Sequence, residues 1–314
     1  MGDKHATEWL NGEDAEGIAR AAALLESGGL VALPSETVYG LAGRADRDHA
    51  VAAIYRAKGR PDFNPLIVHV DGVEAAQRIA HFDARALKLA EHCWRGPLTM
   101  VLPLRADAGL APAVTAGLPT VAVRAPANPV MRAVLAATGL PLAAPSANRS
   151  GTVSPTSAEH VMATLEGRID AVLDGGSAPH GLESTIVAMR EGGWQLLREG
   201  PVSRERIADL IGPPIEVASS RIEAPGQLLQ HYSPGKPVRL NALAAEEGEF
   251  LIGFGPVEGQ ASLSRKGDLS EAAWQLYRCL HLAAAAPEAR VAVAPVPEKG
   301  IGRAINDRLR RAAA

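Results

Sequence analysis

The stretch Lys58-Gly-Arg-Pro-Asp-Phe-Asn-Pro-Leu-Ile-Val-His-Val70 joins a pair of cations to a buried strand. Lys58 and Arg60 stand on either side of a glycine, and Pro61 ends any helix that precedes them. The apolar run that follows Asn64 predicts a strand with His69 inside it. A compact ammonium and a planar guanidinium together suit a polyphosphate or a carboxylate. The alternative is a solvated basic helix end, where cations complement the helix dipole.

Short apolar strands alternate with helices on both sides of this stretch, through residue 211. We predict strands at 30–33, 66–70, 98–104, 120–124, 141–144, 171–173, 185–188 and 194–197. We predict helices at 13–27, 48–57, 73–80, 84–93, 129–138 and 204–211, and one more that begins after Ser157. This interleaving predicts an α/β domain with a mixed, twisted sheet over residues 1–213.

The composition changes after Gly212-Pro213-Pro214. Residues 214–237 are rich in Ser, Pro, Gly and Gln and contain the patch His231-Tyr-Ser-Pro234, which predicts an extended linker. Residues 238–314 then read as strand 250–254, helix 270–285, strand 290–294 and helix 302–311. This order predicts a small second α/β domain that docks on the first.

Composition and charge exclude several classes of protein. The chain has 314 residues, 47% hydrophobic and 21% charged, as in an ordinary globular protein. Its net charge of −3 supplies no general basic field, so we expect no strong nucleic-acid binding. Cys93 and Cys279 form neither a disulfide framework nor a metal motif, which favours a reducing cytoplasm. No signal peptide or membrane span is evident, and we expect no membrane attachment.

The common cofactor and nucleophile motifs are also absent from the sequence. There is no P-loop, no zinc-protease pattern and no Gly-x-Ser-x-Gly elbow. Gly300-x-Gly302 matches only part of a dinucleotide fingerprint and is typical of a tight turn. Instead, polar residues lie just past or at the ends of predicted strands: Thr37, Arg124, Ser146, Asn148, Ser184 and Arg198. These cations and neutral donors favour a cleft that orients anionic groups for transfer chemistry over hydrolysis by a nucleophile.

Seven ordered blocks resemble the YrdC-like domain. They are Pro34-Ser-Glu-Thr-Val-Tyr-Gly-Leu41, Lys58-Gly-Arg-Pro61 with Asn64-Pro-Leu-Ile-Val-His69, Trp94-Arg-Gly-Pro-Leu-Thr99, Thr120-Val-Ala-Val-Arg124, Ala144-Pro-Ser-Ala-Asn148, Gly181-Leu-Glu-Ser-Thr185 and Leu197-Arg-Glu-Gly-Pro201. The His231-Tyr-Ser-Pro234 patch and Lys299-Gly-Ile-Gly-Arg-Ala-Ile305 resemble the long, two-domain form of that family. The resemblance covers about residues 15–311 and implies a YrdC-like twisted mixed sheet followed by a small Rossmann-like α/β domain.

The resemblance also implies an activity, L-threonylcarbamoyladenylate synthesis. Members of the family condense L-threonine, bicarbonate and ATP into threonylcarbamoyl-AMP and pyrophosphate, usually with Mg²⁺. The product serves the threonylcarbamoyladenosine (t6A) modification of tRNA. We therefore expect a cytoplasmic nucleotidyltransferase whose product passes to the tRNA-threonylcarbamoyl transferase machinery. We expect Mg²⁺ to arrive with ATP rather than on a protein metal site.

Carried over position by position, the resemblance implies two groups of binding residues. L-threonine would be held by Thr37, His69, Arg124, the Ala144 backbone and Ser184. ATP would be held by Lys58, Arg60, Asn64, Thr120, Ser146, Ser154, Arg198 and Tyr232. The catalytic roles would fall to Lys58, Arg60, Ser146 and Asn148. The chain departs from the family where Ser35 replaces a common threonine, Arg95 a usual proline and Ser233 a usual alanine.

Two other classes of function stay open at this point. One is a relative that transfers a carbamoyl group to another acceptor, against which the threonine-side residues Thr37, His69 and Ser184 argue. The other is an RNA-binding module, since a cationic concave surface can also hold a phosphodiester backbone. The net charge and the low aromatic content of 4% argue against the RNA-binding module.

Overall fold

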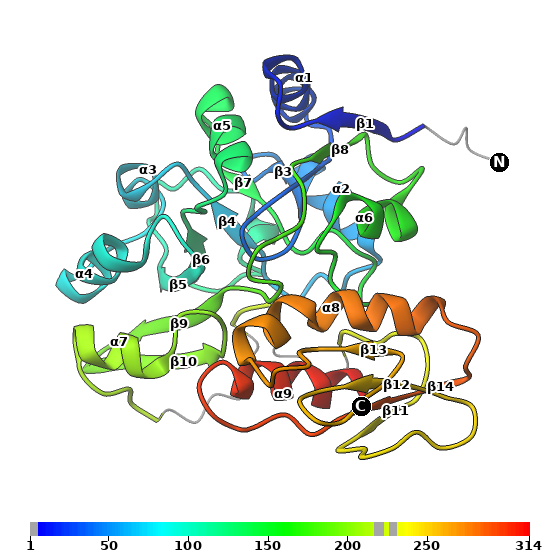
Figure 1. Cartoon of the computed structure of the whole chain (residues 1–314). Coiled ribbons are helices and arrows are strands. Elements are labelled where there is room, and N and C mark those ends of the chain that lie inside the picture. Colours follow the sequence, from blue (N-terminus) through cyan, green and yellow to red (C-terminus); the bar gives the residue numbers. More distant parts are fainter. Residues whose placement is uncertain (1–5, 217–222, 226–230) are drawn as a thin grey trace.

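The computed structural model describes residues 6–216, 223–225 and 231–314. Within them the chain forms a ten-stranded mixed sheet followed by a separate four-stranded sheet. Each sheet is flanked by helices (Figure 1). The predicted α/β fold, with a mixed sheet first and a smaller α/β unit second, is confirmed. Much of the predicted linker, 217–222 and 226–230, lies outside the described residues.

The large sheet is built from short strands in the order β1-β8-β2-β3-β7-β4-β6-β5-β9-β10. Their bounds are β1 Glu8–Asn11, β2 Val31–Leu33, β3 Gly40–Arg44, β4 Ile67–His69, β5 Leu98–Pro103, β6 Thr120–Arg124, β7 Leu142–Ala143, β8 Ala171–Asp174, β9 Thr185–Arg190 and β10 Gly193–Arg198. The central pairing is mixed, because β4 lies parallel to β6 but antiparallel to β7. The sequence did not predict β1, an edge strand with two exposed residues.

Helices cover the large sheet, and most begin at a side chain that caps them. Their bounds are α1 Ala15–Glu26, α2 Asp48–Lys58, α3 Val73–Gln77, α4 Ala84–Cys93, α5 Pro129–Thr138, α6 Ala158–Leu165 and α7 Arg204–Ile211, with a short 3-10 turn η1 at Pro112–Val114. Asp14, Asn128 and Ser157 each accept a hydrogen bond from the first turn of the helix they precede. The helix predicted at 73–80 ends earlier, because Ala80 pairs with Leu104 beside β5.

The large sheet is buried on both faces. Val31 and Leu33 of β2 pack into an apolar cluster that includes Leu25 of α1 and Met131 of α5. Ala32, the residue between them, packs into the main core with Ile54 of α2. Alternate residues of a strand point to opposite faces, so helices on both sides explain the nearly continuous apolar character of these strands.

The C-terminal unit, residues 238–314, is an all-parallel sheet in the order β11-β14-β12-β13 with two helices. Its elements are β11 Val238–Leu240, β12 Glu249–Gly253, β13 Ala261–Ser262, α8 Leu269–Ala285, β14 Arg290–Val293 and α9 Gly302–Ala312. Two strands were predicted there and two were missed, since β11 and β13 are only three and two residues long and partly exposed.

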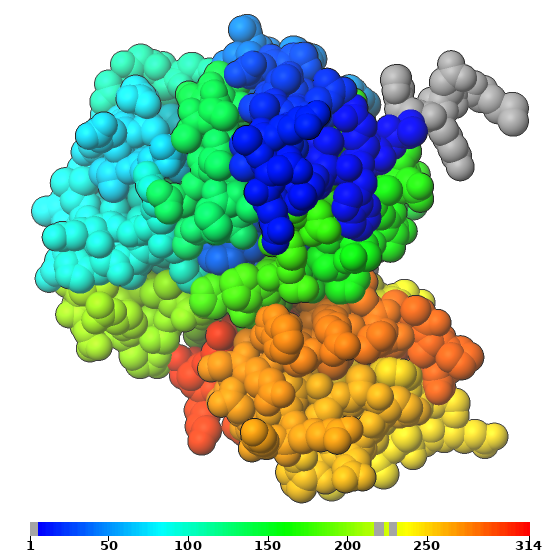
Figure 2. Space-filling view, turned by 45° about the horizontal axis from the view of Figure 1, so that its top comes forward, coloured from blue at the N-terminus to red at the C-terminus, as the bar shows by residue number. Residues whose placement is uncertain are grey.

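The C-terminal unit forms a separate lobe against the first domain (Figure 2). Its apolar core continues across the boundary, because Val38, Val153 and Leu182 of the first domain belong to the same buried cluster. Gly181 allows a close approach at φ +67°, since a Cβ there would lie 2.5 Å from the backbone of Trp274 in α8. The loop before β9 is therefore pressed against the C-terminal unit.

Candidate functional site

A small cavity lies where several strand ends meet residues of the linker. We call it the cleft, and its free volume is about 50 Å³. Its lining comes from the loop before β3, the ends of β4, β6 and β10, the turn after β7 and the residues before β9. The lining residues are Ser35, Thr37, Val38, Gly40, Arg60, Ile67, His69, Arg124, Met131, Ala144, Pro145, Ser146, Glu183, Ser184, Arg198, Pro225, His231 and Tyr232.

Strand register brings the first functional side chains together. His69 and Arg124 are paired residues at the ends of the parallel strands β4 and β6. The Ala144 amide donates to the carbonyl of Ile67 at 3.0 Å, which places the turn after β7 beside them. The carboxyl ends of neighbouring parallel strands are where α/β sheets assemble their sites.

Arg124 is held in a buried network at one end of the cleft. Its Nη1 donates to Thr37 Oγ1 at 2.9 Å and its Nε donates to the Gly96 carbonyl at 3.2 Å. Its Nη2 pairs with Glu36, whose other carboxylate oxygen accepts backbone amides at the start of α5. Burial opposes the charge of Glu36, but Arg124 and these hydrogen bonds lower the pKa of Glu36. The guanidinium is therefore fixed and charged.

His69 lies next to Arg124 as a neutral imidazole. Its ring is 4% exposed, and its Nδ1 has no hydrogen-bond partner among the described residues. Burial, together with the Arg124 charge, lowers the pKa of His69 to about 3. A buried ring nitrogen without a partner is the kind of group that a bound ligand satisfies.

Two further guanidinium groups, those of Arg60 and Arg198, line the cleft. Arg198 donates to the Ser184 carbonyl at 3.0 Å and to Ser184 Oγ at 3.1 Å, and Ser184 Oγ also contacts Thr99 Oγ1 at 2.8 Å. Arg60 donates to the Pro65 carbonyl at 3.0 Å. Neither Arg60 nor Arg198 forms an ion pair with a carboxylate in the described part of the chain. Burial, with Arg198 as a minor contributor, lowers the pKa of Arg60 to about 10. This part of the cleft can receive an anion.

Most of the residues predicted from the sequence line the cleft. These are Thr37, Arg60, His69, Arg124, Ala144, Ser146, Ser184, Arg198 and Tyr232. Lys58 and Asn148 lie behind it and shape its wall. The Lys58 ammonium, 2% exposed, donates to the carbonyl oxygens of Ser146 and Asn148. Asn148 Nδ2 donates to the carbonyl of Thr152 at 2.9 Å, so the Ser146–Asn148 turn is fixed from both sides.

Asn64 is buried nearby, and its Oδ1 has no partner within the described segments. Two other predicted ATP residues do not lie at the cleft. Thr120 begins β6, about 13 Å along the strand from Arg124. Ser154 is fully buried, and its hydroxyl donates to Glu183 Oε1 at 2.6 Å. No signal in the sequence showed that the Ser154 hydroxyl was already bonded to another side chain.

Sequence reasoning missed three charged contributors, Glu36, Glu183 and Arg308. Glu36 and Glu183 lie inside the quoted blocks beside Thr37 and Ser184. The ligand-binding roles were assigned to these neighbouring hydroxyl residues instead. Arg308 occupies the apolar stripe of α9, between Ile305 and Leu309, and is 0% exposed. A lone arginine on an apolar helix face was the signal that could have identified it.

The end of the linker covers the cleft. Tyr232 is 1% exposed and has a left-handed backbone, with φ +67°. Ser233 N donates to the Gly151 carbonyl at 2.9 Å, and Thr152 pairs with Ser233 in a short bridge. His231 lines the cleft beside Tyr232, and burial lowers the pKa of His231 to about 3. Residues 231–234 are therefore packed against the first domain.

Over residues 6–216, 223–225 and 231–314, no cluster of three or more His, Cys, Asp or Glu side chains could hold a metal ion. Glu183, which lines the cleft, is paired with Arg308, and Glu36 is paired with Arg124. None of the described helices has the length and apolar character that crossing a membrane requires.

Comparison with known proteins divides the chain at residue 201. A family described as telomere recombination matches residues 23–200, and a family described as the C-terminal domain of threonylcarbamoyl-AMP synthase matches residues 202–314. The chain is 38% identical to the threonylcarbamoyl-AMP synthase of Bacillus subtilis, over 98% of this chain and 95% of that protein. It is 37% identical to the enzyme of that name from Pyrococcus abyssi, over 93% and 92% of the two chains.

Solved structures give the same result for the fold. The crystal structure of Pyrococcus abyssi Sua5 complexed with L-threonine matches with a TM-score of 0.90 and 34% identity. The match covers 98% of this chain and 97% of that one. Both units of the chain, and not the first domain alone, are therefore similar to that structure.

Proposed function

The chain belongs to the threonylcarbamoyl-AMP synthase family, and on that basis we propose that its cleft holds L-threonine and ATP in adjoining subsites. The chain is a nucleotidyltransferase that condenses L-threonine, bicarbonate and ATP into threonylcarbamoyl-AMP and pyrophosphate. The product is the intermediate for t6A modification of tRNA.

The observation that carries the two-subsite proposal is that the arginines have different partners. At one end, Arg124 is fixed by Glu36 and lies beside Thr37 and the neutral ring of His69. A guanidinium in this setting receives an amino-acid carboxylate, while Thr37, His69, Ser184 and the Ala144 backbone offer partners for the ammonium and hydroxyl groups. We assign this end to L-threonine.

The other end is assigned to the nucleotide. Arg60 and Arg198 contact carbonyl and hydroxyl oxygens but form no ion pair with a carboxylate in the described residues, so phosphate groups would complete their charge. Ser146 and Tyr232 line the same space, and Asn64 carries a buried amide oxygen without a described partner. Lys58 supports the Ser146–Asn148 turn and adds a buried positive charge behind it.

The chemistry that follows needs alignment more than a protein base. The threonine ammonium first loses one proton to solvent, and the resulting amine attacks the bicarbonate carbon. The nitrogen then loses a second proton, which leaves with the bicarbonate hydroxyl as water to give the carbamate. A carbamate oxygen then forms a bond to the α-phosphorus as the bond to the pyrophosphate oxygen breaks. The positive side chains stabilise charge on the leaving pyrophosphate. The neutral state of His69 keeps it available as a hydrogen-bond partner rather than a second positive charge.

We assign the divalent metal to Mg²⁺ that arrives with ATP. Both nearby carboxylates are already paired with arginines, so the residues present fit a metal bound through phosphate oxygens and water. When bound there, Mg²⁺ would withdraw charge from the phosphates. The protein side chains would hold those phosphates in place.

The present cleft is small. Its volume of about 50 Å³ is far below what L-threonine and ATP occupy together, and Pro225, His231 and Tyr232 form part of its lining. We propose that residues 1–213 form the catalytic domain, 214–237 a linker whose residues His231 and Tyr232 cover the cleft, and 238–314 a docked C-terminal unit. We further place the enzyme in the cytoplasm, upstream of the tRNA-threonylcarbamoyl transferase machinery.

The direct test is incubation with ATP, bicarbonate and L-threonine, followed by mass spectrometry. We expect threonylcarbamoyl-AMP and pyrophosphate, with the adenylate carrying the label of ¹³C-bicarbonate. An adenylate without the label, or turnover of ATP to ADP, would exclude the proposed reaction.

A further inference from the structure

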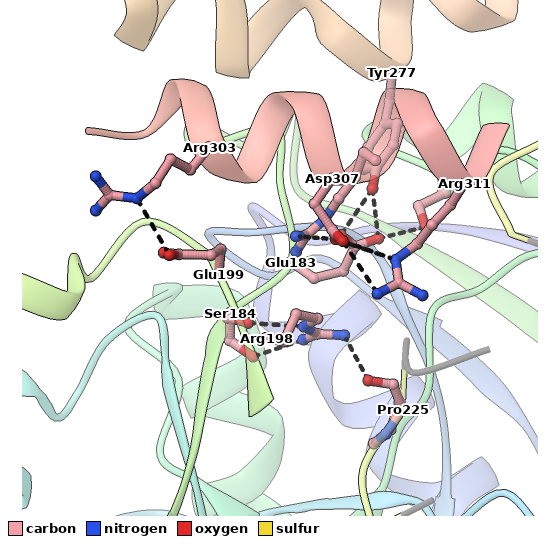
Figure 3. A network of polar contacts seen from close by, with 11 residues as sticks. Glu183, Ser184, Arg198, Glu199, Pro225, Tyr277, Arg303, Asp307 and Arg311 are labelled. Carbon is pink, nitrogen blue, oxygen red and sulfur yellow. Dashed lines mark hydrogen bonds and ion pairs between the residues drawn. The ribbon is translucent and has the colours of Figure 1, made fainter. Parts of the chain in front are cut away.

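The C-terminal unit contacts one carboxylate of the first domain that lines the cleft. Glu183 lines the cleft, immediately before Ser184. Its carboxylate accepts hydrogen bonds from Tyr277 OH, at 2.7 and 2.9 Å, and from Arg308 Nε at 3.2 Å. Tyr277 lies on α8 and Arg308 on α9, and Figure 3 shows Tyr277 pointing at Glu183. Two side chains of the C-terminal unit thus hold the residue next to Ser184.

The same two side chains also contact the linker. The ring of Tyr277 stacks on that of Tyr232, with ring centroids 5.5 Å apart and an interplanar angle of 28°. The guanidinium of Arg308 lies 5.9 Å from the centroid of the Tyr232 ring. Tyr277 and Arg308 therefore touch both the Glu183–Ser184 wall of the cleft and the tyrosine that covers it.

Docking alone does not require this arrangement. Apolar residues such as Leu182 already bury the boundary, and Arg303 of α9 forms partly exposed ion pairs with Glu199 and Glu205. A fully buried charge costs desolvation energy, so a buried Glu183–Arg308 pair is weak evidence for stability by itself. Its specific property is its position against the cleft.

We propose that Tyr277 and Arg308 act as a clamp, which positions Ser184 and Tyr232 so that the cleft is closed only when the C-terminal unit is docked. They are positioning residues, because they act through Glu183 and Tyr232. The clamp rests on the proposed function and deepens it, since it gives the C-terminal unit a role in binding L-threonine and retaining the adenylate.

The contacts predict how the effect would spread. Arg198 donates to both the carbonyl and the hydroxyl of Ser184, as Figure 3 shows. A shift of residues 183–184 would therefore disturb a threonine contact and the orientation of a phosphate-binding arginine together. Loss of the clamp should weaken substrate binding and let the adenylate escape, while the C-terminal unit stays folded.

The test uses the full-length protein and three variants: Tyr277→Phe, Glu183→Gln and the double variant that carries both changes. A fourth variant, Arg303→Gln, serves for comparison. Tyr277→Phe keeps the ring that stacks on Tyr232 but loses both hydrogen bonds to Glu183. Arg303→Gln is the matched control, because it removes two ion pairs between the units, with Glu199 and Glu205, neither of which lines the cleft. Calorimetry measures L-threonine affinity, and the ratio of free adenylate to pyrophosphate measures escape.

We expect Tyr277→Phe and Glu183→Gln to weaken L-threonine binding roughly 3- to 30-fold. The double variant should bind L-threonine no more weakly than the single variant with the lower affinity, because both changes break the same contact. Arg303→Gln should bind as the wild type does. Three outcomes would each overturn the clamp. They are additive losses of L-threonine affinity in the double variant, an equal loss of affinity in Arg303→Gln, and unchanged affinity in Tyr277→Phe. If the wild type binds L-threonine but forms no adenylate, the proposed function fails, and the binding data still decide the clamp.

Discussion

The ammonium of Lys58, at the last residue of α2, donates hydrogen bonds to the carbonyl oxygens of Ser146 and Asn148 in the turn after β7. The lysine is fully buried, and burial, followed by repulsion from Arg60, lowers its pKa well below the usual range. Lys58 therefore shapes the phosphate end of the cleft from behind, rather than projecting into it as a free cation.

Lys58→Met should destabilise the protein as well as inactivate it. The Ser146 carbonyl would keep the Asn148 amide as a donor, whereas the Asn148 carbonyl would lose the only donor it has among the described residues. Leaving a buried acceptor unpaired costs about 1–3 kcal/mol. Urea denaturation checks the loss of unfolding free energy. Normal stability combined with selective loss of ATP binding would instead show that Lys58 acts directly on phosphate.

L-threonine should be strongly preferred over L-valine, which has a methyl group in place of the hydroxyl. Thr37, His69 and Ser184 surround the proposed threonine end with buried polar groups, and these would lose their partner when valine binds. A site that recognises a hydroxyl group can reject an analogue that lacks it by about 10⁴-fold. Pyrophosphate release measured with each amino acid gives the ratio, and similar rates would refute the threonine assignment.

Stability should fall as the pH drops below about 6.5, because buried neutral histidines resist protonation. Burial is the main cause that lowers the pKa of His69 to about 3, of His231 to about 3 and of His281 to about 4. The unfolded chain takes up these protons first, so each group lowers the unfolding free energy by about 1.4 kcal/mol per pH unit down to its folded pKa.

His281→Asn offers the check of this pH dependence. His281 stacks on His160 with centroids 3.8 Å apart and is absent from the cleft lining, so its replacement removes one titrating group without touching the substrate subsites. Thermal and urea unfolding between about pH 5 and 6.5 give the slope of the unfolding free energy against pH. In the variant this slope should be smaller by the contribution of about one proton. An unchanged slope would mean that His281 titrates normally in the folded protein.

Tyr232→Ala should release the adenylate early and also lower stability. In the structure the ring is 1% exposed and stacks on Tyr277, so its truncation removes buried apolar contacts at a cost of about 3 kcal/mol or more. The ratio of free adenylate to pyrophosphate, with a melting curve, measures both effects. Equal ratios in variant and wild type would show that the linker only joins the two units and does not retain the adenylate.

The sequence predicted the parts of the site that local pattern determines. Arg124 and Arg198 are the last residues of apolar strands and Ser184 immediately precedes one, and such strand ends gather at one edge of the sheet. Pattern did not reveal which hydroxyls were already used, and Ser154 donates to Glu183 instead of facing the cleft. Arg308 depends on a contact between residues 125 positions apart, which only the docked C-terminal unit creates. The short strands β11 and β13 carry too few residues for a periodic signal.

The central claim is that one cleft contains two subsites with different arginines. Calorimetry of Arg60→Ala and Arg124→Lys, each titrated separately with ATP and with L-threonine, tests it most directly. Arg60→Ala should weaken ATP binding by about 1.5–3 kcal/mol, the worth of a hydrogen bond to a charged group, and leave L-threonine affinity nearly unchanged. Arg124→Lys keeps the charge beside Glu36 but loses the planar fork, so it should weaken L-threonine binding and spare ATP. Equal losses for both ligands in both variants would contradict the division of the cleft.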